Sequence, residues 1–101
     1  MKEKQIEQIL VREVRAKGGI CPKLVSPGTG GMPDRIILLP GGVIAFAELK
    51  APGRKPGPLQ AVRINQLRKL GFPVYVIDSP DMIGETIRTL TGPYTGERNV
   101  K

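Results

Sequence analysis

Three charged residues at the ends of two apolar stretches are the side chains in this sequence best suited to chemistry. Asp34 opens one apolar stretch, and Glu48 and Lys50 close the next one along the chain. If the two stretches pair as a hairpin, the beginning of the first lies beside the end of the second, so Asp34 comes close to Glu48 and Lys50. Glu48 and Lys50 are two residues apart in a strand and therefore point to the same face, whereas Leu49 points the other way.

Two carboxylates that converge on one spot suit a divalent cation. They repel each other, and burial raises their pKa values, so a cation between Asp34 and Glu48 relieves an unfavourable charge. Carboxylate oxygens together with waters suit the octahedral coordination of Mg²⁺. Lys50 would then bind a phosphate or orient and activate the attacking water. Two simpler interpretations remain: the charges end the strands in solvent, or Lys50 forms an ion pair with one carboxylate.

The two apolar stretches, 35–39 and 43–50, have the continuous hydrophobic character of buried strands, and Pro40-Gly41-Gly42 predicts a tight turn between them. Helical spacing, short apolar runs and Gly and Pro positions predict the other elements. These are a helix over 2–17, a short strand over 20–25, a turn-rich loop over 26–33, an exposed basic loop over 51–58, a helix from 58 or 59 to 70, a strand over 74–77 and a helix over 80–90. This order predicts an α/β sandwich with a mixed sheet.

The helix that begins near residue 58 is expected to face the core with an apolar stripe. The stripe consists of Leu59, Val62, Gln66 and Leu70, with Ile64 and Leu67 close by. Gly71 follows the last of these residues and predicts the C-terminus of the helix.

Composition narrows the possible chemistry. The sequence has no histidine and one cysteine, Cys21, which excludes a Ser-His-Asp triad, a Cys/His zinc site and an intramolecular disulfide. Its 101 residues are enough for one domain, expected over 1–90, with a loose polar tail over 91–101. The 16 Lys and Arg against 9 Asp and Glu give a net charge of +7, which favours a polyanionic partner such as nucleic acid. The lone thiol and the lack of an apolar run of about 20 residues favour a cytoplasmic protein.

The sequence resembles the PD-(D/E)XK nucleases, and within them the VRR-NUC (virus-type replication-repair nuclease) domain. The bare signature is Pro33-Asp34 followed, after a short hairpin, by Glu48-Leu49-Lys50. The longer resemblance covers about residues 3 to 90 and is carried by Ser26-Pro27-Gly28, Gly31-Met32-Pro33-Asp34-Arg35, Phe46-Ala47-Glu48-Leu49-Lys50-Ala51-Pro52-Gly53, Leu59-Gln60 and Gly71-Phe72-Pro73-Val74-Tyr75-Val76.

The resemblance implies a restriction-endonuclease-like core, in which a central mixed sheet is flanked by helices in the order α-β-β-β-α-β-α. It also implies a phosphodiesterase that depends on Mg²⁺ or Mn²⁺. Asp34 and Glu48 would be catalytic metal ligands, with the backbone carbonyl of Leu49 as a further ligand. Lys50 would serve the nucleophilic water and the charge of the transition state.

Two further site residues are implied by the resemblance. Related nucleases carry a first-helix glutamate that completes the metal site. Glu7 fits this position because apolar residues follow it at the offsets of three, four and seven, and Glu3 is the alternative. Gln60 matches a glutamine that family members carry near the active site, at the start of the second helix. Without the resemblance, Glu7 is a boundary residue of an amphipathic helix and Gln60 a polar residue at a helix start.

The implied function is an endonuclease that acts on structured or branched DNA and is similar to the Holliday-junction resolvases. Such an enzyme would be a homodimer with two active sites, joined through the apolar side of the first or the last helix. Its origin would be a phage or prophage, and it would act in the cytoplasm. Arg54 and Lys55 in the basic loop, together with Arg35, are the predicted DNA contacts. The alternatives are a non-catalytic DNA-binding module on a nuclease fold, or a flap-type or helicase-associated nuclease subunit.

Overall fold

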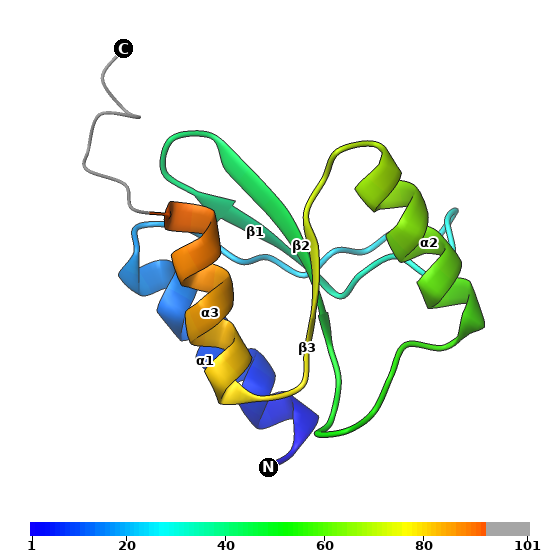
Figure 1. Ribbon diagram of the computed structural model, residues 1–101, viewed down its shortest axis with the longest axis horizontal. Helices are drawn as coiled ribbons and strands as arrows, with labels where there is room; N and C mark the ends of the chain where they lie inside the picture. Colours follow the sequence, from blue (N-terminus) through cyan, green and yellow to red (C-terminus); the bar gives the residue numbers. More distant parts are fainter. Residues whose placement is uncertain (93–101) are drawn as a thin grey trace.

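A computed structural model describes residues 1–92, in which three helices and three strands follow one another in the order α-β-β-α-β-α (Figure 1). The elements are α1 Glu3–Ala16, β1 Arg35–Leu39, β2 Val43–Leu49, α2 Pro58–Lys69, β3 Val74–Ile77 and α3 Pro80–Thr91. The predicted helices, hairpin and last strand are therefore confirmed. The last helix extends one residue further than predicted, to Thr91; the part of the predicted tail beyond residue 92 lies outside the described residues.

The sheet is mixed, as expected, and β2 is its central strand. β1 pairs with β2 in antiparallel orientation, from Arg35 opposite Ala47 to Leu39 opposite Val43. β3 pairs with β2 in parallel orientation, which requires a crossover, and α2 lies within that crossover. The C-terminal ends of β2 and β3 therefore lie at the same end of the sheet as the N-terminal end of β1.

The predicted strand over 20–25 is wrong as a strand. The segment runs beside β1 and makes two isolated antiparallel bridges, from Ile20 to Leu38 and from Lys23 to Arg35. Pro22 explains the interruption because it has no N–H to donate to a ladder. Its carbonyl still accepts a hydrogen bond from the Ile36 N–H at 3.1 Å. The segment is therefore anchored to β1 without continuing the sheet.

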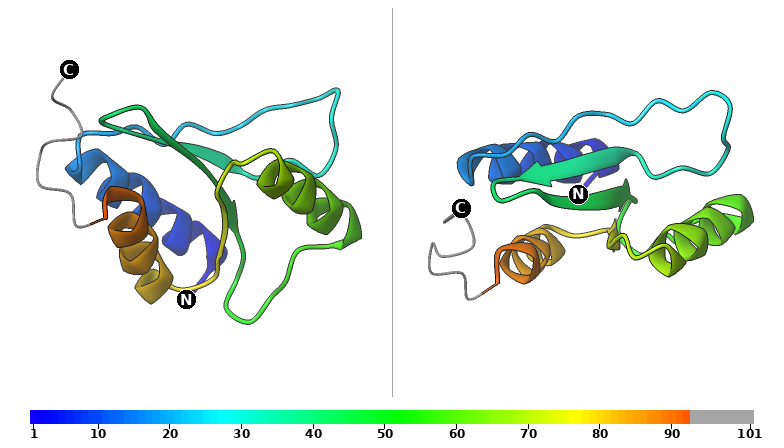
Figure 2. Two further views of the ribbon diagram at one scale, coloured as in Figure 1. Left: turned by 45° about the horizontal axis from the view of Figure 1, so that its top comes forward. Right: turned by 90° about the horizontal axis from the view of Figure 1, so that it is seen from above.

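The helices cover the two faces of the sheet unequally. α1 and α3 pack together on one face, and α2 packs on the other, as Figure 1 and the left view of Figure 2 show. The larger core lies between the sheet and the helix pair; it includes Ile6, Leu10, Val14, Ile37, Leu49, Ile77, Ile83 and Ile87. The smaller core under α2 consists of Phe46, Ile64, Leu67 and Val74. Residues of β2 alternate between the two cores, so each strand position has a defined face.

The predicted apolar stripe of α2 is wrong in its direction. Ile64 and Leu67 are the buried residues of this helix, whereas Leu59, Val62 and Leu70 are 57%, 64% and 66% exposed. The smaller core has four buried residues, and α2 contributes two of them. An apolar stripe on a short helix does not show on which side the sheet will lie.

The apolar sides of α1 and α3 are used within the chain. Ile6, Leu10 and Val14 of α1 are fully buried. Ile83 and Ile87 of α3 are nearly so. The expectation that a dimer forms through these sides is therefore wrong, because the larger core already covers them. None of the helices within residues 1–92 is long and apolar enough to cross a membrane.

Candidate active site

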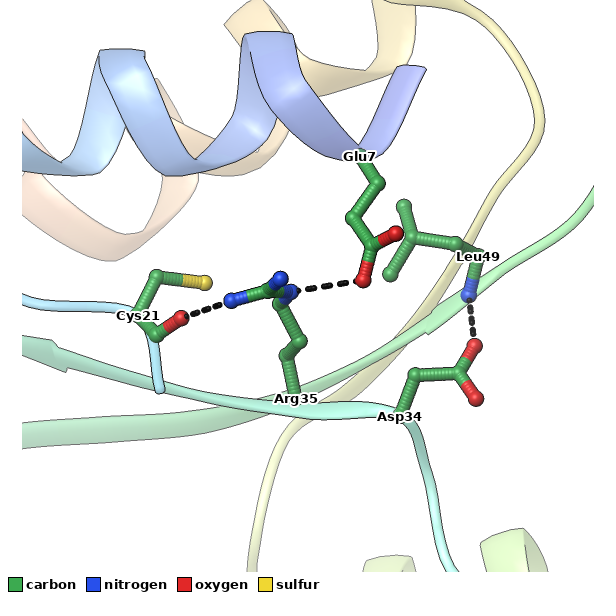
Figure 3. Close-up of polar contacts among 5 residues, drawn as sticks. All are labelled: Glu7, Cys21, Asp34, Arg35 and Leu49. Atoms are coloured by element: carbon green, nitrogen blue, oxygen red, sulfur yellow. Dashed lines mark hydrogen bonds and ion pairs between the residues drawn. The ribbon is translucent and has the colours of Figure 1, made fainter. Parts of the chain in front are cut away.

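The sheet register brings Asp34 and Glu48 together. Arg35 lies opposite Ala47, so Asp34, one residue earlier, lies next to Glu48 at the edge of the antiparallel pair. The Oδ2 atom of Asp34 accepts a hydrogen bond from the backbone N–H of Leu49 at 2.9 Å (Figure 3). The carboxylate of Asp34 is therefore held against the β2 backbone at the position predicted from the hairpin.

The loop before Asp34 is shaped by a glycine and a proline. Gly31 has a φ of +76°, and a Cβ at this position would lie 2.7 Å from the backbone oxygen of Leu59. Only glycine combines this backbone conformation with so close an approach to α2. Pro33 is buried directly before Asp34. The end of loop 26–33 is thus held against the start of α2, directly before Asp34.

Glu48 is the most deeply buried charged residue of the described chain, with 1% of its surface exposed. Its Oε2 atom accepts a hydrogen bond from Gln60 Nε2 at 2.6 Å and pairs with Lys50 Nζ at 3.1 Å. Its Oε1 atom is buried and has no hydrogen-bond partner. The ion pair of Lys50, which the sequence left open as an alternative, is therefore present, and it occupies only one of the two carboxylate oxygens.

The environment of Glu48 raises the pKa of its carboxyl group. Burial makes the largest contribution, and the negative charge of Asp34 adds to it; the contacts with Lys50 and Gln60 act in the opposite direction. Because Glu48 is buried, water does little to stabilise its negative charge. Lys50 and Gln60 stabilise that charge only in part.

Gln60 is placed as the sequence predicted, beside the carboxylates. It lies in the first turn of α2, where its Oε1 atom accepts a hydrogen bond from the backbone N–H of Gly57 at 3.2 Å. With its carbonyl oxygen held in this way, the amide nitrogen is directed to Glu48. The helix start thus orients a donor toward the buried acid.

Glu7 is paired with Arg35 and has no contact with Asp34 or Glu48. It extends from α1 to Arg35, whose Nε atom donates to Glu7 Oε2 at 2.8 Å and whose Nη1 atom donates to the Cys21 carbonyl at 2.6 Å (Figure 3). No group of three or more acidic, His or Cys side chains within residues 1–92 could hold a metal. Glu7 and Glu3 do line an open hollow that also includes Asp34. A role for either glutamate as a third ligand therefore stays a prediction.

The predicted DNA contacts lie in different environments. Arg54 and Lys55 are exposed in the loop that follows Lys50, and this loop is tied to the end of β3 by a hydrogen bond from the Gly53 N–H to Asp78 Oδ2 at 3.2 Å. Arg35 is committed to its ion pair, with 14% of its side chain exposed. Contact with DNA stays a prediction for all three.

Known proteins resemble this chain along nearly its whole length. A protein of Acyrthosiphon pisum secondary endosymbiont phage 1, named "Putative nuclease p44", is 51% identical over 82 residues, which are 81% of this chain and 88% of the phage protein. A solved structure described as a VRR_NUC domain superposes with a TM-score of 0.81 at 30% identity and covers 94% of this chain and 100% of its own. The chain belongs to the VRR-NUC family. The sequence matches no profile of a known protein family.

The carboxylates of Asp34 and Glu48 in this VRR-NUC domain fit a divalent cation. Glu48 Oε1 is a buried oxygen without a partner, and Asp34 supplies a second carboxylate next to it. A buried acceptor left unsatisfied is unfavourable, and a hard cation with oxygen ligands would satisfy it. Asp34 and Glu48 would hold the ion. Leu49 would contribute only its backbone, since its side chain is buried in the larger core.

The sequence reasoning missed the contact of Arg35 with Glu7 and Cys21. A signal for it existed: the neighbouring Ile36 pairs with Phe46 on the α2 face, so Arg35 must point to the α1 face, where Glu7 borders the apolar side of the helix. Burial raises the pKa of the Cys21 thiol to about 11. This contact cluster joins α1 to the sheet and to the segment that precedes loop 26–33.

Proposed function

We propose that this VRR-NUC domain is a Mg²⁺- or Mn²⁺-dependent endodeoxyribonuclease with Asp34, Glu48 and Lys50 at its reaction centre. The observation that supports the proposal best is the unpartnered Oε1 atom of Glu48, buried beside Asp34 and Lys50. A purely structural acid buried to this extent would be expected to have both oxygens satisfied.

Each residue has a distinct part in the proposed reaction. When bound, a divalent cation would supply positive charge to the phosphodiester and make a water more acidic. Lys50 places a second positive charge on the same face of the sheet, where it holds the attacking water or stabilises charge that develops in the transition state. Gln60 and Lys50 both engage Glu48 Oε2 and leave Oε1 for the ion. The Leu49 N–H likewise orients the carboxylate of Asp34, because it donates a hydrogen bond to Oδ2.

The experiment combines two substitutions with two measurements. Asp34→Asn is nearly isosteric and keeps an oxygen that can accept the Leu49 N–H, so the fold should persist while cleavage and calorimetric Mn²⁺ binding are lost. Lys50→Ala should abolish cleavage and leave Mn²⁺ binding intact, because Lys50 supplies charge and is no ligand. Matched controls are Asp81→Asn and Lys69→Ala, which change exposed residues of α3 and α2. Unchanged Mn²⁺ binding in Asp34→Asn, or wild-type cleavage by Lys50→Ala, would refute the assignment.

We also propose that the enzyme is a homodimer and prefers branched DNA. A small domain gains stability by covering apolar surface, and the exposed apolar side chains of α2, Leu59, Val62 and Leu70, are available for this. Two equivalent sites related by a two-fold axis would suit a four-way junction. Light scattering gives the assembly, and a panel of labelled duplex, flap, fork and four-way junction DNAs gives the preference. A monomer that cuts flaps and spares junctions would contradict this proposal and favour a flap nuclease.

A further inference from the structure

One side of α1 carries a line of cations that the proposed reaction does not use. Lys4, Arg12 and Arg15 lie at helical spacing on the side of α1 next to Gln8 and Val11, and all three cations are exposed. Together with Lys23 from the bridged segment, they line an open groove whose floor includes the ion pair of Arg35 and Glu7. Arg35 neutralises Glu7, and the contact of Arg12 with Glu13 is long, at 3.9 Å, and exposed, so the four exposed cations determine the charge of the groove.

This groove leads to the candidate active site. A second hollow contains Asp34 at one end and shares both Glu7 and Lys23 with the first. The two hollows are therefore neighbours on the surface, the first reaching Arg15 near the end of α1 and the second reaching Asp34. Glu3 also lines the second hollow, so the acidic groups are concentrated at the reaction centre and the cations along the approach to it.

The dimensions and charge suit the backbone of a nucleic acid. Lys4 and Arg15 are eleven residues apart in a helix, or about 16 Å at about 1.5 Å per residue. This length corresponds to about five nucleotides of one B-DNA strand at about 3.4 Å each. Exposed lysines and arginines in a row neutralise successive phosphates and read no sequence.

We infer that the groove formed by α1 and the bridged segment is the track that binds one DNA strand by its phosphates and guides it to Asp34 and Glu48. The inference rests on the proposed nuclease function for one part only, that the bound strand leads to Asp34 and Glu48. It assigns Lys4, Arg12, Arg15 and Lys23 to DNA binding, in addition to the loop residues predicted from the sequence.

The test measures binding without cleavage. Fluorescence anisotropy follows a labelled duplex and the corresponding single strand in EDTA, between about 50 and 200 mM salt, for the wild type and the Arg12→Gln/Arg15→Gln double variant. The variant should bind about tenfold or more weakly, and the slope of log affinity against log salt should decrease by about 2, because two phosphate contacts are lost. Binding of the duplex in preference to the single strand, or the reverse, identifies the form in which the strand enters.

The matched control is Lys69→Gln/Arg88→Gln, which removes the same charge from exposed positions of α2 and α3. It should bind DNA nearly as the wild type does. Amide shifts of the wild-type chain on addition of DNA provide a measurement that needs no variant, and they should be concentrated at Lys4, Gln8, Arg12 and Arg15.

Equal loss in the two double variants, or no shifts along α1, would overturn the inference, because binding would then depend on net charge alone or on another surface. The result is independent of the proposed reaction. If wild-type protein binds through the groove and never cleaves DNA with Mg²⁺ or Mn²⁺, the groove stands and the nuclease proposal fails.

Discussion

Replacing Arg35 with Met should destabilise the protein substantially, because the guanidinium joins three separate parts of the fold. It hydrogen-bonds to Glu7 at 2.8 Å and to the Cys21 carbonyl at 2.6 Å, and the side chains of Arg35 and Glu7 are 14% and 23% exposed. Met keeps an apolar stem of similar shape, so packing of the stem is largely preserved. The change therefore isolates the polar contacts.

The expected loss follows from these contacts. A hydrogen bond from a charged donor contributes roughly 1.5 kcal/mol or more, which applies to the Cys21 carbonyl. The Glu7 pair lies between an exposed pair, worth about 0–1 kcal/mol, and a buried pair, whose disruption costs about 3–5 kcal/mol. With a discount for the remaining exposure, the total is about 2–3 kcal/mol. For a domain of this size, this lowers Tm by about 10–14 °C.

Urea and thermal unfolding, followed by circular dichroism, measure this loss. The control is Arg12→Met, because Arg12 and Glu13 are 72% and 47% exposed and 3.9 Å apart, so its effect should stay within about 0.5 kcal/mol. Glu7→Gln, alone and combined with Arg35→Met, completes a double-mutant cycle with an expected coupling of about 1 kcal/mol. If Arg35→Met is as stable as Arg12→Met, or if the coupling is zero, the contact does not hold α1 to the sheet.

Three further predictions concern Glu48, its partner Gln60 and Cys21. Burial raises the pKa of Glu48, so the metal-free wild type loses stability as the pH rises from the ordinary glutamate range through the raised pKa. Glu48→Gln cannot ionise and should melt higher than wild type at neutral pH in EDTA, with the difference vanishing at acidic pH; a variant that melts lower at neutral pH would show that the Lys50 pair outweighs burial. Gln60→Ala should reduce cleavage about 10- to 100-fold because Glu48 loses an orienting donor, and single-turnover rates at the wild-type level would contradict this. The Cys21 thiol, with a pKa of about 11 and 4% exposure, should resist alkylation at mildly alkaline pH until denaturant is added, as mass spectrometry would show.

Local patterns in the sequence were sufficient where neighbouring residues decide the structure. A hairpin has a register set by its short turn, so the approach of Asp34 to Glu48 followed from the positions of the two strands alone. Helix ends were similarly predictable, because Gly71 and Pro80 act on the adjacent backbone. The same local reasoning failed at Pro22, where one missing donor reduced an expected strand to two bridges.

Only the tertiary structure decided how distant elements meet at the site. The burial of Glu48 and its contact with Gln60 depend on α2 packing through Ile64 and Leu67, a choice that its exposed stripe of Leu59, Val62 and Leu70 did not indicate. Glu7 pairs with Arg35 because α1 covers the opposite face of the sheet from Glu48. The physical reason is that spacing along one element determines which side chains share a face, whereas the partner of that face is selected by packing among all the elements at once.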